Sequence, residues 1–535
     1  MSAQLKFFAD KYMFLYKLCV TYGEILIIKV ENPLLRFILT LNLMSDKTLF
    51  GHPRGLFVLS FTEMWERFSY YGMRAILLLF LLDKTSGGMG MKEGEGGATY
   101  GLYTFSVYLL SLPGGWLADN VLGQRKAIWY GGITIMLGHI VLAFPSTQVV
   151  FFLGLALVAI GTGLLKPNIS SIVSELYPEG GARRDAAFSI FYMGINAGSF
   201  LGITIVGYLG QRVGWHYGFG AAAVAMFLGL LNYRFFATPY LQEKGLYPKV
   251  NKSATGDSAP VKVQPLSWIL LGALIVFLLV MQFNGTFTWD SKKGVATSMG
   301  VICVAVVLIY FANLLFASGL TKIEMKRVVI LFILFWGAVL FWAGFEQQGS
   351  SLQIFADRYS ELPFGMPSTW FQNFNAFFIL LFAPMVGGIW VFLERRKINP
   401  PLLVKFAIAL FLVALGYYIM VLGAKVAVQG LKASALVLTF TYVFHTIGEL
   451  CLSPVGLSAY TKLAPKQFLS QLMGVWFVAT ALGNLFAGLF AGGFDEENVQ
   501  QMPDMFMSIV WFCLIVGAVI LILQKPLKEW TGGIK

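Results

Sequence analysis

The sequence predicts an all-α protein that crosses a lipid bilayer many times. Its 535 residues are 57% hydrophobic and only 12% charged, whereas soluble chains carry about 25% charged residues. Apolar runs of roughly 18 to 25 residues, long enough to span the hydrocarbon core as helices, recur from residue 55 to the end of the chain. These observations exclude an ordinary soluble protein.

The charge balance and the supply of metal ligands exclude several function classes. Lys and Arg exceed Asp and Glu by 39 to 27, but the cations form short clusters between apolar runs, which is typical of membrane anchors and not of a nucleic-acid track. The chain has no P-loop, nucleophile elbow or metal-ligand spacing. Its cysteines and histidines are scattered at Cys19, Cys303, Cys451, Cys513, His52, His139, His216 and His445. We therefore expect a lipid bilayer around the chain, no nucleic-acid partner, no metal or cofactor, and no enzymatic activity.

The first 43 residues do not fit a membrane span. They are apolar on average, but charges interrupt every long stretch, at Lys17, Glu24, Lys29, Glu31 and Arg36. From Met44, a short polar and partly basic lead precedes the first long apolar run. We hypothesise that translation starts at Met44 and that residues 1–43 are an upstream extension; an interfacial helix is the alternative.

Fourteen membrane helices in a 6 + 2 + 6 arrangement are predicted in order along the chain. The first six lie near 55–82, 98–118, 127–147, 149–174, 186–209 and 214–236. A polar stretch over 238–265 leads to a pair near 266–288 and 295–317. Six more lie near 328–352, 370–393, 401–421, 434–458, 468–492 and 505–524. The predicted divisions are a six-helix bundle over 44–237, a linker with a transmembrane hairpin (266–317) over 238–326, a second bundle over 327–528 and a tail over 529–535.

The loops predict the orientation of these helices. Cations cluster in the loops of one side, among them Arg125, Lys126, Arg183, Arg184, Lys326, Arg327, Arg395, Arg396 and Lys397. By the positive-inside rule, both termini and the 238–265 loop are cytoplasmic.

Two six-helix halves resemble the layout of the major facilitator superfamily, whose substrate sites lie at the midplane between the halves. The loop GGWLADNVLGQRKA between the second and third predicted helices holds Asp119 and Arg125. It resembles the superfamily's inter-helix motif, whose charges bridge helices and helix-dipole ends when the inner side is closed. The resemblance implies a gating role for these two residues.

Charged side chains inside the predicted spans point to function, because each one costs roughly 2.5 to 3.5 kcal/mol at the bilayer centre. The first helix carries charges and phenols within an arc of about 140°, at Glu63, Glu66, Arg67, Tyr70, Tyr71 and Arg74. Ion pairs along the helix could neutralise these charges, but apolar residues would be cheaper. Lys166, Glu346 and Glu449 lie in other helices. A snorkelling lysine, a polar helix end and a protonated glutamate, respectively, are the structural alternatives for these three.

Three motifs resemble those of proton-dependent oligopeptide transporters. The pattern E-x-x-E-R-F-x-Y-Y-G occupies residues 63–72, F-Y-x-x-I-N-x-G-S occupies residues 191–199, and GELCLSPVGLS lies in the predicted tenth helix. The match covers residues 50–528, and the 6 + 2 + 6 layout is similar to that of the family's bacterial members. Ala197 and Phe200 replace the usual leucines of the second motif.

The resemblance implies inward symport of di- and tripeptides with protons. By match to the family, Arg74 and Lys166 would hold the peptide carboxylate, and Glu449, Asn196 and Asn375 its ammonium group. The side-chain pockets would be lined by Tyr70, Tyr71, Tyr108, Trp342, Ser453 and Trp476. Proton coupling would run through Glu63, Glu66 and Arg67. Two gating pairs are implied, Lys166 with Glu449 on the cytoplasmic side and Arg74 with Glu346 on the external side.

Two other interpretations compete with peptide–proton symport. A transporter of the same fold could carry nitrate or expel a drug, but the intact E-x-x-E-R cluster argues against nitrate and the paired cations argue against a drug exporter. A membrane enzyme or redox subunit lacks the necessary ligands. We expect a monomeric secondary transporter in the inner membrane, driven by a proton gradient.

Overall fold

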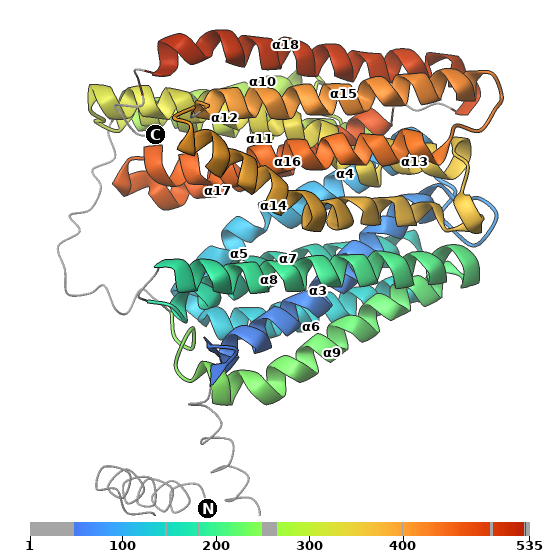
Figure 1. The fold of residues 1–535 in the computed structure, drawn as a ribbon, viewed down its shortest axis with the longest axis horizontal. Helices are drawn as coiled ribbons and strands as arrows, with labels where there is room; N and C mark the ends of the chain where they lie inside the picture. Colours follow the sequence, from blue (N-terminus) through green and yellow to red (C-terminus); the bar gives the residue numbers. More distant parts are fainter. Residues whose placement is uncertain are drawn as a thin grey trace, which may run out of the picture.

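The computed structural model describes residues 48–144, 147–178, 181–248, 265–398, 400–492, 496–528 and 530. This part of the chain is nearly all helical (Figure 1), which confirms the predicted fold class. A two-stranded hairpin, β1 (Thr48–Leu49) antiparallel to β2 (His52–Pro53), precedes the first helix. Residues 1–43, with the hypothesis on Met44, lie outside the described residues, as does the tail apart from Trp530.

The first half of the molecule is a helical bundle. Its elements are α3 (Arg54–Leu82), α4 (Glu93–Leu109), α5 (Ser111–Leu117), η1 (Ala118–Leu122), α6 (Gln124–Ala143), α7 (Gln148–Glu175), α8 (Gly181–Tyr208), η2 (Leu209–Val213) and α9 (Trp215–Leu241). Helix α3 packs against α8 and α9, and α6 packs against α7 and α9. The predicted second helix, 98–118, is interrupted at Leu110, between α4 and α5.

The second half repeats this architecture. Its elements are α12 (Lys322–Phe345), η4 (Glu346–Gly349), α13 (Ser351–Tyr359), η5 (Pro363–Gly365), η6 (Ser368–Gln372), α14 (Asn373–Arg395), α15 (Leu402–Val428), α16 (Ala435–Leu463), η7 (Lys466–Phe468), α17 (Leu469–Ala491), η8 (Glu496–Gln501) and α18 (Met502–Lys528). Helix α15 packs against α16 and α18, and α12 packs against α17. Hydropathy did not predict α13, because its charged and polar residues make it a poor span.

A helical hairpin connects the two halves. Helices α10 (Pro265–Phe283) and α11 (Lys292–Ala317) pack on each other, and α11 also contacts α4, α12 and α17. Phe311 of α11 is buried against Phe332 and Phe335 of α12. The hairpin is therefore fixed mainly to the second half and reaches the first half through α4.

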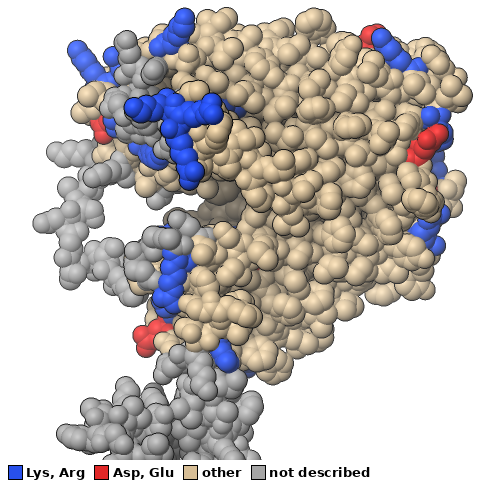
Figure 2. Space-filling model, in the orientation of Figure 1, with Lys and Arg blue, Asp and Glu red and all other residues tan. Residues whose placement is uncertain are grey.

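The surface agrees with a membrane-spanning protein. Of the described helices, eleven are long and apolar enough to cross a bilayer; the full count of fourteen spans stays a prediction. In Figure 2, the visible Lys, Arg, Asp and Glu side chains gather toward two ends of the molecule, with a broad uncharged surface between them. Helices suit such a surface, because their backbone groups bond to one another within the helix and lipid offers the backbone no partners.

The two ends differ in how the halves meet. We call the end where α3 begins and α18 finishes the terminal face, and the end where α3 finishes the opposite face (Figure 1). Toward the opposite face, α4 packs on α17 and α8 on α14. Gly97 and Gly101 of α4 meet Gly488 of α17 at backbone distance, because small residues let helices approach closely. On the terminal face, the molecule is hollowed between the halves (Figure 2).

Candidate functional site

The charged motif on α3 forms a buried ion cluster. Arg67 Nε lies 2.9 Å from Glu63 Oε1 and 2.5 Å from Glu66 Oε2, and all three side chains are at most 4% exposed. One guanidinium thus faces two carboxylates, which leaves a negative charge to be offset inside the protein. Lys166 of α7 is within electrostatic range of the cluster. A proton taken up by either carboxylate would change this balance, so the arrangement can couple protonation to charge pairing.

Aromatic rings surround the cations of the first half. The guanidinium of Arg67 lies over the rings of Tyr70 and Tyr71, at 5.4 and 5.8 Å from their centroids. The Nζ atom of Lys166 lies 3.9 Å from the ring centroid of Tyr108. Such cation–π contacts hold a cation without neutralising it, so the contact with Tyr108 would leave a protonated Lys166 able to attract an anion.

Glu449 lies near the middle of α16, in the second half, and is held by an amide. Asn375 Nδ2 donates to Glu449 Oε2 at 3.0 Å and lies 3.2 Å from the Thr446 hydroxyl. Lys166 and Glu449, both described and both half-buried, make no ion pair with each other in this structure. Charged groups at such depth normally face a water-filled space, in line with the hollow on the terminal face.

The other predicted lining residues occupy different environments. Asn196 donates to the Tyr192 carbonyl, and the Ser453 hydroxyl and the Trp342 ring N–H have no hydrogen-bond partner in the described structure. Trp476 is buried against the rings of Tyr460 and Phe406 of its own half. The structure therefore brings Asn375 to Glu449 and Tyr108 to Lys166. The roles assigned to these residues stay predictions.

On the opposite face, an ion pair crosses the seam between the halves. Arg74 of α3 pairs with Glu346, the first residue of η4, and both side chains are almost fully buried. Arg74 Nε also donates to the Tyr100 hydroxyl at 2.7 Å. The external pair predicted from the sequence is thus formed, while the predicted pair of Lys166 with Glu449 is not.

Hydrogen bonds of polar side chains reinforce this closed side. Gln211 of η2 donates to the Ser368 hydroxyl at 2.8 Å and to Asp357 Oδ1 at 3.3 Å. The hydroxyl of Thr369 donates back to Gln211 Oε1 at 2.9 Å. Nearby, Asn373 Nδ2 donates to the Thr204 hydroxyl. One glutamine therefore ties the first half to three residues of the second.

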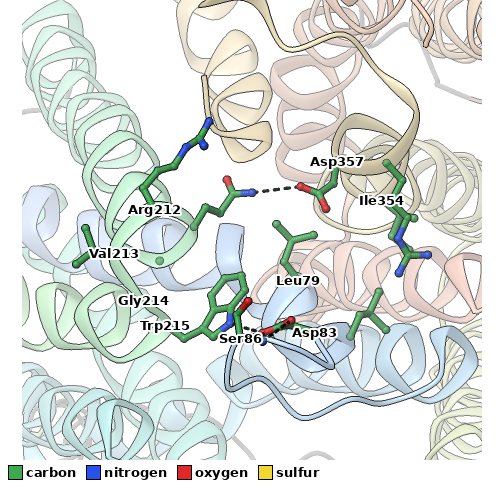
Figure 3. Close-up of a pocket in the computed structure, with 13 residues that line it drawn as sticks. Leu79, Asp83, Ser86, Arg212, Val213, Gly214, Trp215, Ile354 and Asp357 are labelled. Carbon is green, nitrogen blue, oxygen red and sulfur yellow. Dashed lines mark hydrogen bonds between the residues drawn. The ribbon is translucent and has the colours of Figure 1, made fainter. Parts of the chain in front are cut away.

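A polar pocket of about 430 Å³ opens beside these bonds (Figure 3). It is lined from the first half by Asp83, Arg212 and Trp215, and from the second half by Asp357 and Arg358. Burial alone would raise the pKa of Asp83, but hydrogen bonds from Thr85, Trp215 and Ser86 together bring it below its usual value. The charges of this pocket are engaged by the protein itself, since Arg358 pairs with Glu93 and Arg212 with the Gly365 carbonyl.

The predicted loop motif at the terminal face binds a helix end. Asp119 lies in η1, and Arg125 is the second residue of α6. Arg125 donates to the Gln242 carbonyl at 2.6 Å and to the Thr238 hydroxyl at 3.0 Å, at the end of α9. A cation at a helix C-terminus is favourable. No group of three or more metal-ligating side chains occurs among the described residues.

Known protein families offer a comparison that is independent of the geometry described above. A sequence model of the POT family matches residues 125–511. The chain belongs to the POT family. This confirms the family predicted from the three motifs and identifies the chain as a multi-pass membrane protein of a transporter family.

Two relatives and one solved structure are similar to this POT family member over most of its length. The chain is 38% identical to "Peptide transporter YePEPT" of Yersinia enterocolitica subsp. palearctica serotype O:3 (strain YE-P4), over 91% of this chain and 97% of the relative. It is 36% identical to "Di-/tripeptide transporter" of Lactococcus lactis subsp. cremoris, over 92% and 99%. A crystal structure of "peptide transporter POT in complex with sulfate" superposes with a TM-score of 0.80 at 36% identity, covering 92% of this chain and 99% of the other.

Three residues of this POT family member that form contacts near the opposite face were not predicted from the sequence. Tyr100 contacts Gly349 and Gln211 contacts Asp357 between the two halves, but Tyr100, Gln211 and Asp357 belong to no motif that we recognised. Tyr100 could have been noticed as a phenol on the second predicted helix, eight residues before Tyr108. Gln211 and Asp357 lie at helix ends, where polar residues are ordinary, so the sequence carried no signal for them.

Proposed function

We propose that this protein is a proton-coupled symporter that imports di- and tripeptides across the inner membrane by alternating access. The names of its relatives support a peptide substrate, and the family supports transport. In this proposal the protein works as a monomer with both termini cytoplasmic, and the proton gradient drives it without a cofactor.

One observation carries the proposal. The first half offers Lys166, the second half offers Glu449 with Asn375, and Lys166 and Glu449 do not pair with each other, whereas Arg74 is engaged by Glu346. A peptide zwitterion has a carboxylate for the cation and an ammonium group for the acid. Few fixed charges with aromatic walls suit a ligand whose ends are constant and whose side chains vary.

The coupling of protons to peptide follows from differential stabilisation of two states. A peptide carboxylate that draws Lys166, or a proton that neutralises a glutamate, weakens one charge pair and favours the state held by the other. The Arg67 cluster supplies two buried carboxylates for that proton, close to Lys166. Peptide and proton would thus bias the same rearrangement.

Uptake by proteoliposomes tests the proposal. We expect purified protein to concentrate labelled alanyl-alanine under an inward proton gradient and an inside-negative potential, and to ignore free alanine. Dissipating the gradient should abolish accumulation but leave peptide exchange. Movement of nitrate or a drug without any dipeptide uptake would contradict the substrate class, and with it every peptide-binding role given above.

A further inference from the structure

We propose that Tyr100 is a positioning residue of the opposite-face gate, and that Gly349 is the socket that receives its hydroxyl when the gate closes. Tyr100 belongs to α4 of the first half, and Gly349 ends the η4 turn of the second half. The pair therefore lies across the seam that must separate if the protein opens on this face.

The first support is the hydrogen bond to Arg74. Tyr100 is fully buried, and its hydroxyl accepts from Arg74 Nε, while Arg74 Nη2 pairs with Glu346. Nε and Nη2 belong to one planar, rigid guanidinium, so the phenol and the carboxylate are held by the same group. The phenol thereby fixes the direction in which Arg74 presents its charge to Glu346.

The second support is the shape around Gly349. A methyl group on this residue would overlap the Tyr100 hydroxyl oxygen and would lie 2.8 Å from the ring carbon that bears it. The end of the η4 turn is attached to its own half, because the Ser350 hydroxyl donates to the Ala487 carbonyl of α17. Gly349 thus provides the room for the phenol at the point where α17 packs on α4.

Together these contacts make Tyr100 specific to the closed state. When η4 moves away from α4, the hydroxyl loses its place at Gly349 and Arg74 loses Glu346. A side chain that fits only one state stabilises that state by its differential contacts. Loss of the phenol should therefore weaken closure without removing either charge of the ion pair.

The test measures the distance between the halves on this face. Spin labels at Ser86 and Gln429, both exposed at the ends of opposite halves, would be attached to the full-length protein with its cysteines replaced. We expect Gly349→Ala to shift the distance distribution toward the longer, open population. Tyr100→Phe should cause a smaller shift, roughly tenfold in the ratio of closed to open, the scale of one hydrogen bond to a charged group.

The double variant decides between a socket and a general packing defect. Because phenylalanine lacks the overlapping oxygen, Tyr100→Phe combined with Gly349→Ala should restore part of the short-distance population lost in Gly349→Ala. Gly387→Ala, at a helical glycine with no neighbouring atom within reach, is the matched control and should leave the distances unchanged. The proposal is overturned if Gly349→Ala leaves the distances unchanged, or if the two substitutions simply add.

A transport measurement separates this inference from the proposed function, on which its gating role rests. If alanyl-alanine is not a substrate but the distances behave as expected, the gate stands and the substrate class fails. If peptide uptake is normal in Gly349→Ala and the distances do not change, the function stands and the socket fails. Tyr100→Phe should reduce proton-driven uptake more than exchange, a split that loss of folded protein would not produce.

Discussion

The two faces of the seam between the halves present opposite arrangements of similar side chains. On the opposite face, Arg74 is paired with Glu346 and Gln211 bonds across the halves. Away from the opposite face, Lys166 contacts the ring of Tyr108 and Glu449, in the middle of α16, accepts from Asn375. At the terminal face, a hollow separates the halves (Figure 2). The difference teaches that one charge pair, Arg74 with Glu346, is satisfied across the halves, while Lys166 and Glu449 are each held within their own half.

This comparison also explains why both pairs are not made together. Closing the terminal face would bring Lys166 to Glu449, but rigid halves that meet at one end separate at the other. The glycine contacts of α4 with α17 fix the present arrangement. In this structure the space between the halves is therefore open to the terminal face (Figure 2).

The largest effect is expected when one carboxylate of the Glu63, Glu66 and Arg67 cluster is replaced by an amide. Glu66→Gln should abolish accumulation of alanyl-alanine under a proton gradient, because the carboxylate that lies 2.5 Å from Arg67 can no longer gain and lose a proton. Exchange of peptide across the membrane should persist, since the seam is unchanged. Uptake and counterflow in proteoliposomes measure both, with Glu95→Gln, a half-exposed acid on α4, as the control.

If Glu66→Gln still concentrated peptide, the buried cluster would be a structural ion network and the coupling would lie elsewhere.

Glu449→Gln should come next, because it removes a predicted ligand of the peptide ammonium group together with the predicted partner of Lys166. We expect exchange and proton-driven uptake to fall together, about 10- to 100-fold at limiting peptide. Initial rates over a range of peptide concentrations measure this. Glu361→Gln, an exposed acid of the same half, should behave as wild type; normal exchange in Glu449→Gln would remove this residue from the site.

Gln211→Ala should loosen the opposite face with a moderate effect. Several hydrogen bonds across the seam are lost, each with a net contribution of about 0.5 to 1.5 kcal/mol. Spin labels at Ser86 and Gln429 should report a larger open population. Gln501→Ala, an exposed amide at the same face, is the control, and identical distances in both variants would show that the seam depends on its ion pair and helix packing alone.

Lys292→Ala should have the smallest effect. Lys292 Nζ lies 3.6 Å from Glu95 Oε2, and both side chains are partly exposed; such pairs contribute about 0 to 1 kcal/mol. The same distance measurement should change little. A shift as large as that of Gln211→Ala would mean that the hairpin of α10 and α11 braces the closed face.

The sequence predicted those parts of the molecule that follow from local patterns. Long apolar runs predicted the order of the helices, and the spacing of Glu63, Glu66 and Arg67 on one helix face predicted that they would meet. The resemblance to the family implied a shared role for Asn375 and Glu449, which the fold brings into contact.

The remaining features depend on contacts between distant segments. Gly349 and Tyr100 are 249 positions apart in the chain, and no local pattern links a turn glycine to a phenol. Helix α13 is short and polar, so hydropathy could not distinguish it from a loop. Which of the two faces is closed is a property of the packed halves and not of either one alone.

The central claim is that Glu449 binds the ammonium group of a peptide and Lys166 its carboxylate. The most direct test combines variants of these residues with modified peptides. Binding of alanyl-alanine, its N-acetyl form and its C-terminal amide would be measured by calorimetry with wild type, Glu449→Gln and Lys166→Ala. We predict that Glu449→Gln weakens binding of alanyl-alanine about 10- to 100-fold but hardly affects the acetylated peptide, and that Lys166→Ala behaves likewise toward the amide. Equal losses for all three ligands would contradict the claim.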